Sequence, residues 1–276
     1  YSPSTIALGS GAEPKRARAR SHGMIIWPKQ LMGAATARFT PQCSFEQAIF
    51  VIGHMRCGST ALSHILCSQP DISGYGEAHI TYRSEADLGL LALNQWRRGA
   101  WKPKASHLFD KILHSRYDGD PPASFFAARA IFVARSPEPS IASIRNLFRE
   151  IGSEEYQHPG EAEAYYRDRL KDMLRLWDRF PSENRIGVRY EDLVENPDAT
   201  LDGISRHLGV SPPLANVYVA NKAARSRGAG DPLVAAFQTK IVKKSDLADN
   251  LEIKSEILSN ESSKLFNLFI RNCCGY

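Results

Sequence analysis

Residues 53–60 combine the residue types that hold a phosphate or a sulfate. They read Gly-His-Met-Arg-Cys-Gly-Ser-Thr and lie between a short apolar run and a helical pattern. Successive backbone N–H groups in a glycine-containing turn, continued by the free N–H groups of a helix start, form a concave anion site. Arg56 adds a positive charge inside this turn. The segment is therefore a candidate site for the phosphate or sulfate of a nucleotide.

The same segment lacks a residue that nucleoside triphosphate enzymes need. Gly53 and Gly58 enclose a four-residue gap as in a P-loop, but Ser59 stands where the lysine should follow the second glycine. No predicted strand ends in the Asp that would help to hold Mg²⁺. A P-loop kinase or NTPase is thus an alternative that the sequence weakens. An ordinary strand-to-helix turn with a Ser or Thr cap is the alternative without function.

An Arg and a Ser follow a second apolar run. Arg135 comes directly after residues 130–134, and Ser143 lies eight positions later in a helical pattern that Ser136 is expected to cap. The guanidinium offers a fork of N–H donors and the hydroxyl offers one more, which suits a terminal phosphate. Taken alone, an Arg at a strand end is more often a surface ion-pair residue. The pair is a second candidate anion site.

The elements around these segments predict the fold class. Short apolar runs typical of buried strands cover residues 48–52, 130–134 and 185–190. Apolar residues at three- and four-residue spacing predict helices over residues 60–67, 139–150, 161–180 and 197–208. Strands that alternate with helices indicate an α/β fold, a P-loop-like parallel sheet flanked by helices on both faces. Ligands in such folds bind beyond the carboxyl ends of the strands, where both candidate sites are expected.

The length and composition of the chain favour one globular catalytic domain. A chain of 276 residues with 43% hydrophobic content can build one large core. We expect an N-terminal extension over residues 1–44, partly flexible, and the catalytic domain over residues 45–276.

No apolar run approaches the roughly eighteen residues that suggest a membrane span. The net charge of +5 is modest, and the basic residues at 15–20 lack interleaved aromatics, so nucleic acid is not an expected partner.

The five cysteines favour a reducing compartment. Their number is odd, and the adjacent Cys273 and Cys274 are a poor basis for a disulfide framework. We therefore expect a cytoplasmic protein, or a lumenal one if an upstream signal was removed, because the first residue is Tyr1 rather than Met. The histidines show no metal-ligand pattern and no Cys pair supports zinc, so no metal is expected.

Residues 53–60 and the pair Arg135 and Ser143 together resemble the donor-binding signatures of the sulfotransferase family. The first resembles the family's 5′-phosphosulfate loop, and the Arg with a Ser eight positions later resembles its 3′-phosphate pair. Residues 188–209 resemble a late segment of the family, and residues 226–232 resemble its C-terminal loop over the nucleotide. The resemblance implies 3′-phosphoadenosine 5′-phosphosulfate (PAPS) as the donor. The residues that it assigns to the donor are Arg56, Cys57, Gly58, Ser59, Thr60, Arg135, Ser143, Tyr190, Ser226 and Arg227.

The resemblance also implies the catalytic groups. Glu77, twenty-one residues after Arg56, matches the general base of the tyrosylprotein and bacterial carbohydrate branch, and His79 is the second candidate for that role. Arg83 aligns in spacing with an Arg near the acceptor site of that branch, but it could equally be a helix-surface residue. Lys111, the second residue of an Asp-Lys pair, would place an ammonium near the bridging oxygen and stabilise the transition state.

Several points stay open at the level of the sequence. The expected reaction is transfer of a sulfuryl group to an acceptor hydroxyl or amine, and the acceptor is a small molecule, a glycan, a lipid or a peptide. Tyr190 either approaches the nucleotide or lies at the edge of the core with a solvated hydroxyl. A homologue that binds the nucleotide without activity is a further alternative, against which the joint presence of Glu77 and Lys111 argues. The oligomeric state is open.

Overall fold

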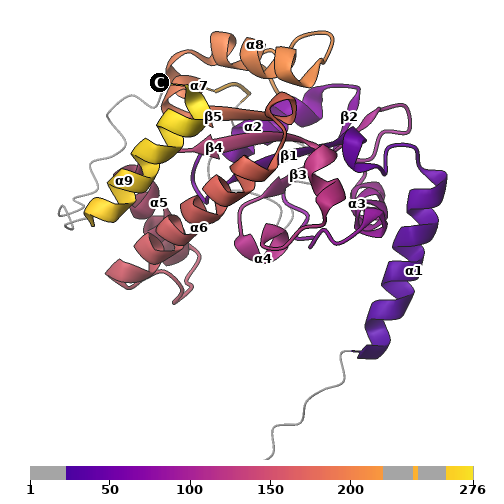
Figure 1. Ribbon diagram of the computed structural model, residues 1–276, viewed down its shortest axis with the longest axis horizontal. Coiled ribbons are helices and arrows are strands. Elements are labelled where there is room, and N and C mark those ends of the chain that lie inside the picture. Colours follow the sequence, from indigo (N-terminus) through magenta and orange to yellow (C-terminus); the bar gives the residue numbers. More distant parts are fainter. Residues whose placement is uncertain (1–22, 220–238, 242–258, 276) are drawn as a thin grey trace, which may run out of the picture.

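A five-stranded parallel sheet forms the centre of the molecule (Figure 1). The computed structural model describes residues 23–219, 239–241 and 259–275. In this part of the chain the strands lie in the order β2-β3-β1-β4-β5, and all neighbouring strands are parallel. The strands are β1 (Ala48–Gly53), β2 (Ile72–Ser73), β3 (His107–Ile112), β4 (Arg129–Ala134) and β5 (Arg185–Arg189). The predicted α/β fold is therefore confirmed.

Helices cover both faces of this sheet (Figure 1). The α-helices are α1 (Gly23–Phe39), α2 (Ser59–Ser68), α3 (Glu85–Arg97), α4 (Ser115–Asp118), α5 (Pro137–Glu150), α6 (Pro159–Arg179), α7 (Tyr190–Glu195), α8 (Pro197–Leu208) and α9 (Asn260–Phe269). Shorter helical segments are the 3-10 helices η1 (Phe45–Gln47), η2 (Ala123–Ala127) and η3 (Ser182–Asn184) and the π-helix η5 (Ile270–Cys274). None of the helices within the described ranges is both long and apolar enough to cross a membrane.

Alternate residues of β1 enter two different cores. Phe50 and Ile52 belong to the core shared with α3, α5, α6 and α9, whereas Ile49 and Val51 belong to the core shared with α2 and α8. Successive side chains of a strand point to opposite faces, so a strand covered on both faces must be apolar throughout. This explains why β1 and β4 could be predicted as continuous apolar runs.

The four predicted helices correspond to α2, α5, α6 and α8, whereas β3 was missed. The strand β3 contains His107, Asp110 and Lys111, and these polar residues interrupt the apolar run that a buried strand usually shows. Asp110 and Lys111 are nevertheless only 1% and 2% exposed. A second difference concerns Tyr190, which begins α7 instead of ending β5. Because Lys111 is part of β3, it is a buried residue near the end of a strand.

A buried arginine joins the ends of β1 and β3. In α6, Arg169 donates from Nε to the carbonyl of Gly53 at 2.9 Å and from Nη2 to the carbonyl of Ile112 at 3.0 Å. Its two terminal nitrogens also pair with the carboxylate of Asp118 at 2.7 and 2.8 Å. Buried carbonyls at strand ends have no ladder partner and must be satisfied by other donors. The helix α6 thus fixes the edge of the sheet at which both candidate anion sites begin.

The helices α1 and α3 pack together by close approach of their backbones. A Cβ atom on Gly89 of α3 would lie 1.9 Å from the carbonyl oxygen of Gly33 in α1. A Cβ atom on Gly33 would lie 2.3 Å from the carbonyl oxygen of Ala86. Only glycine fits at these two positions. Figure 1 shows that α1 extends from this contact away from the rest of the molecule.

We predict that Gly89→Ala lowers the free energy of unfolding by about 1–3 kcal/mol, because the new methyl group must push the two backbones apart. Gly203→Ala in α8 is the matched control, since a Cβ there meets nothing within 4 Å. The control should gain about 0.5–1 kcal/mol from the higher helix propensity of alanine. Urea denaturation of the two variants measures both values. Equal stability of the two variants would contradict the packing described.

Candidate active site

The loop between β1 and α2 has the backbone pattern of an anion-binding turn. Arg56 and Gly58 have positive φ angles of 66° and 83°, and Cys57 between them does not. Such alternation turns successive N–H groups toward one side of the chain. Gly58 is the N-cap of α2, whose first N–H groups have no partner within the helix. Donors from the loop and from the helix start can therefore converge on one bound anion.

The two candidate anion sites meet at one edge of the sheet. The strands β1 and β4 are neighbours, and Gly53 lies opposite Val133 in their register. The residues that follow these strands therefore emerge side by side, as the sequence predicted. Nε of Arg56 donates a hydrogen bond of 2.9 Å to Oγ of Ser143 in α5. This bond joins the loop after β1 directly to the helix after β4.

Tyr190 lies between the loop and Arg135. The guanidinium carbon of Arg135 is 4.5 Å from the centre of the Tyr190 ring, a cation–π contact. A Cβ atom on Gly58 would lie 2.5 Å from Cδ2 of the same ring, so the loop has no room for a side chain there. Tyr190 is half-buried and belongs to the wall of this site.

A buried histidine that the sequence analysis missed connects the loop to β4. His54 accepts the backbone N–H of Arg135 at Nε2, over 3.0 Å, and its Nδ1 lies 2.8 Å from the carbonyl oxygen of Met55. Because Nε2 accepts a hydrogen bond, the proton lies on Nδ1 and the ring is neutral. Burial lowers the pKa of His54 to about 4. His54 thus fixes the backbone of Arg135 against the loop without adding charge.

Buried Asp110 anchors the segment that contains Glu77. One carboxylate oxygen of Asp110 accepts the backbone N–H groups of Ala78 and Lys111, each at 2.8 Å. The other accepts the hydroxyl of Tyr82 at 2.6 Å. Burial raises the pKa of Asp110 to about 7. Glu77, the residue before Ala78, is in this way attached to the end of β3.

The side chain of Glu77 lies beside His79, and that of Lys111 reaches the start of α2. Glu77 is 8% exposed, and its Oε1 lies 3.5 Å from Nδ1 of His79, whose side chain is 39% exposed. The ammonium of Lys111 donates to Oγ1 of Thr60, over 3.3 Å, in the first turn of α2. The candidate cation therefore reaches the start of the helix that borders the anion-binding turn.

Two other predicted residues, Arg83 and Cys57, have different surroundings. Arg83 precedes α3, has a side chain 57% exposed and lies 3.5 Å from Asp87, so it faces a carboxylate of α3. Cys57 is fully buried, and burial raises the pKa of its thiol, which leaves its backbone N–H as the group suited to an anion. Ser226 and Arg227 lie outside the described residues.

Ser136 does not have the helix-capping role that the sequence predicted. It stands at the N-cap position of α5, but its side chain makes no capping hydrogen bond. Its hydroxyl and its backbone N–H instead donate to one carboxylate oxygen of Glu191, at 2.8 and 3.1 Å. The residue joins the end of β4 to α7, so the predicted cap is wrong, and the bond holds Tyr190 and its helix close to the site.

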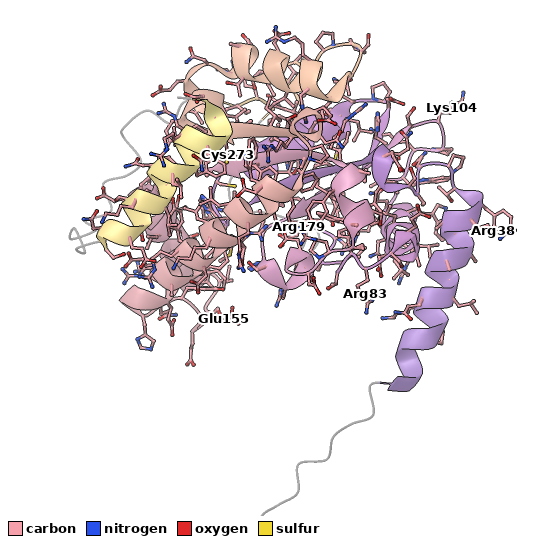
Figure 2. The ribbon with its side chains drawn as sticks, in the orientation of Figure 1. Arg38, Arg83, Lys104, Glu155, Arg179 and Cys273 are labelled. Carbon is pink, nitrogen blue, oxygen red and sulfur yellow. The ribbon has the colours of Figure 1, made fainter. Side chains whose placement is uncertain are left out.

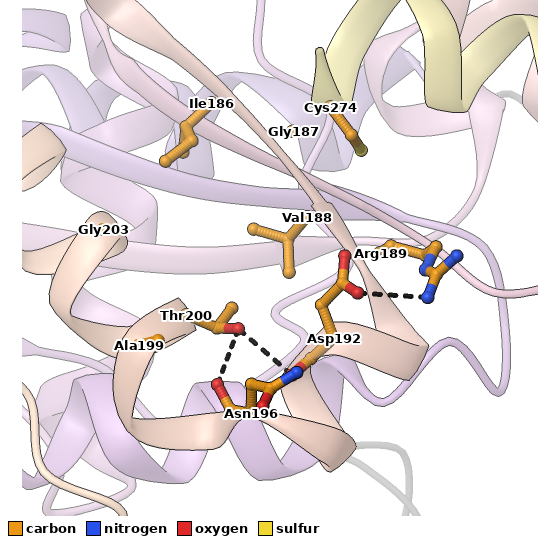
Figure 3. Close-up of a pocket in the computed structure, with 10 residues that line it drawn as sticks. All are labelled: Ile186, Gly187, Val188, Arg189, Asp192, Asn196, Ala199, Thr200, Gly203 and Cys274. Atoms are coloured by element: carbon orange, nitrogen blue, oxygen red, sulfur yellow. Dashed lines mark hydrogen bonds and ion pairs between the residues drawn. The ribbon is translucent and has the colours of Figure 1, made fainter. Parts of the chain in front are cut away.

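A separate pocket of about 370 Å³ lies at the edge strand β5 (Figure 3). Its walls are β5, α7, α8 and Cys274, and it contains none of the predicted site residues. The guanidinium of Arg189 and the carboxylate of Asp192 form an ion pair of 3.1 Å at this pocket. Burial raises the pKa of Cys274 to about 12, so its thiol is not activated. We find no catalytic arrangement among these lining residues.

The central part of the chain matches a known family. Residues 100–213 match the family model described as the sulfotransferase family. This segment includes Lys111, Arg135, Ser143 and Tyr190. This match covers less than half of the 276 residues of the chain. The matched family is the one that the two candidate donor-binding segments resemble.

Solved sulfotransferase structures share the fold. The sulfotransferase domain from the curacin biosynthetic pathway is 17% identical, with 80% of this chain and 96% of that chain covered and a TM-score of 0.50. The sulfotransferase domain from the Synechococcus PCC 7002 olefin synthase is 19% identical, with 80% and 93% covered and a TM-score of 0.53. At these identities the likeness concerns the fold alone. No curated protein matches the chain in sequence.

The neutral state of His54 predicts a pH dependence of stability. The pKa of His54 falls from 6.5 to about 4 on folding, so between these values the unfolded chain binds more protons than the folded enzyme. Stability is therefore lost as the pH falls through this window. Relative to His54→Gln, which does not titrate, the free energy of unfolding should fall by up to about 1.4 kcal/mol more per pH unit. Parallel pH profiles from urea denaturation would refute a neutral buried His54.

Proposed function

We propose that this protein is a sulfotransferase that uses PAPS as its donor and transfers the sulfuryl group to an acceptor hydroxyl or amine. The observation that supports this most strongly is the hydrogen bond between Arg56 and Ser143. Arg56 is assigned to the 5′-phosphosulfate and Ser143 to the 3′-phosphate, and a nucleotide with both groups on one ribose requires the two residues to be close. In this proposal residues 45–276 form the catalytic domain.

The residues of the site suit an anionic donor. Arg56 and Arg135 supply charged N–H donors, and the turn and the start of α2 supply backbone N–H groups. Residues 53–60 contain no acidic side chain, and buried His54 is neutral. When bound, PAPS supplies the sulfuryl group and a phosphate leaving group. Arg135 would bind the 3′-phosphate while Tyr190 keeps its guanidinium in place.

Glu77 would act as the general base that accepts the proton of the acceptor. Its carboxylate is buried, and the hydrogen bond between Ala78 and Asp110 fixes the backbone next to it. A base must be held within hydrogen-bond reach of the proton that it removes, and this anchor provides such a fixed position. His79, which is more exposed, lies close enough to pass that proton on to solvent.

Lys111 would stabilise the charge that develops on the leaving oxygen. Its ammonium reaches Thr60 at the start of α2, next to the turn assigned to the phosphosulfate. A cation fixed in advance at the point where negative charge appears lowers the barrier, because no group has to reorient during the reaction. Arg83, which faces Asp87, remains a prediction for the acceptor side.

We predict that Arg56→Ala and Arg135→Ala each weaken the binding of 3′-phosphoadenosine 5′-phosphate, the desulfated product, by about tenfold or more. Each change removes a charged hydrogen-bond donor that is worth about 1.5–3 kcal/mol. Arg175→Ala in α6 is the matched control, since its side chain is 77% exposed. Isothermal titration calorimetry measures the three affinities. Wild-type affinity in either test variant would remove that arginine from the donor site.

Glu77→Gln should bind the same nucleotide within about twofold of the wild type, while its kcat falls by roughly 100- to 10,000-fold because the base is lost. The substitution preserves the size of the side chain and removes only its basicity. His79→Gln is the comparison variant and should keep most of the activity. Full activity in Glu77→Gln together with loss in His79→Gln would transfer the role of base to His79.

A further inference from the structure

A stripe of exposed apolar side chains runs along α1. Pro28, Leu31, Met32, Ala35 and Phe39 recur at intervals of three and four residues, so they lie on one face of the helix. All five are exposed, with exposed fractions of 73% for Leu31, 57% for Met32 and 81% for Phe39. We call these five residues the α1 stripe.

The α1 stripe is not needed for packing within the described fold. The contact with α3 uses the opposite face of α1, where Gly33 and Ala37 approach the backbone of α3. That contact fixes α1 to the protein, and Figure 1 shows the helix extending away from the body. Contiguous exposed apolar side chains on a folded protein commonly mark a protein or membrane contact. The stripe therefore has the accessibility that a docking surface requires.

The charged residues of α1 itself are both positive. The helix contains Lys29 and Arg38 and no acidic residue. Four further basic residues lie a few positions before it in the sequence, at positions 15, 16, 18 and 20. Figure 2 shows Arg38 on the side of α1 that is turned away from the body of the molecule. Glu85, at the start of α3, is exposed and acidic, so the balance is positive without being uniform.

We propose that α1 docks this protein on an anionic lipid surface. The α1 stripe would enter the interface between headgroups and acyl chains, while Lys29 and Arg38 would contact the headgroups. This inference does not depend on the donor or on the base proposed above.

A second copy of the chain fits the stripe less well than a lipid surface does. The stripe spans eleven helical steps, roughly 17 Å. A single helix face of this length buries well below the ~800 Å² per partner of a stable protein interface. Two copies joined through their stripes would also bring Lys29 and Arg38 of one copy near those of the other. An anionic surface meets both the apolar and the basic residues.

Sedimentation with lipid vesicles tests the proposal on the whole chain. Vesicles of phosphatidylcholine with about 30% phosphatidylserine should bind the protein at least about tenfold better than phosphatidylcholine alone, and salt should weaken this binding. The double variant Leu31→Glu/Phe39→Glu should reduce binding to the anionic vesicles by about tenfold or more. The matched control is Ile151→Glu/Val217→Glu, because these apolar residues are 52% and 67% exposed and lie outside the stripe. The control should bind as the wild type does.

Three results would overturn the proposal. The first is absence of binding of the wild type to the anionic vesicles, and the second is equal binding of the stripe variant and the wild type. The third is a dimer in sedimentation velocity that the stripe variant abolishes while vesicles bind neither protein, since that result would assign the stripe to a second copy. Thermal unfolding of the stripe variant at the wild-type temperature verifies that it is folded, as expected for substitutions at exposed positions.

Discussion

Three side chains of one helix satisfy the backbone at the ends of three strands, and the candidate active site depends on these hydrogen bonds. Arg169 of α6 donates to the carbonyls that end β1 and β3. Tyr166 donates to the carbonyl of Arg135 just after β4. Tyr165 donates to the carbonyl of Leu113 just after β3 and accepts the N–H of Met55 in the loop. These carbonyls are thus satisfied by donors from α6, whereas the first N–H groups of α2 have no partner within the helix.

The same arrangement explains how a loop with unfavourable backbone angles stays fixed. A non-glycine residue with positive φ, such as Arg56, costs free energy that the surroundings must supply. His54, Tyr165 and Arg169 hold the residues around it through buried hydrogen bonds. The arginine side chain can then reach Ser143 from a backbone that does not need to rearrange. Buried hydrogen bonds thus hold the backbone on both sides of Arg56.

Sequence patterns predicted those parts of the molecule that are specified by residues adjacent in the chain. The strands β1 and β4 are continuous apolar runs, and the glycines and Arg56 of the loop are adjacent in the chain, so both could be found by inspection. The strand β3 could not, because Asp110 and Lys111 are polar and their burial is set by distant partners. His54 and Arg169 were missed for the same reason, since a buried polar residue has no signature in the sequence until its hydrogen-bond partners are known.

The proposed function requires one nucleotide to bind where β1 and β4 end. The most direct measurement is a crystal structure of the enzyme with 3′-phosphoadenosine 5′-phosphate. We predict that its 5′-phosphate lies on the N–H groups of residues 57–60 and that its 3′-phosphate contacts Arg135 and Ser143. A nucleotide bound elsewhere, for example in the pocket beside β5, with the loop and Ser143 uncontacted, would contradict the central claim.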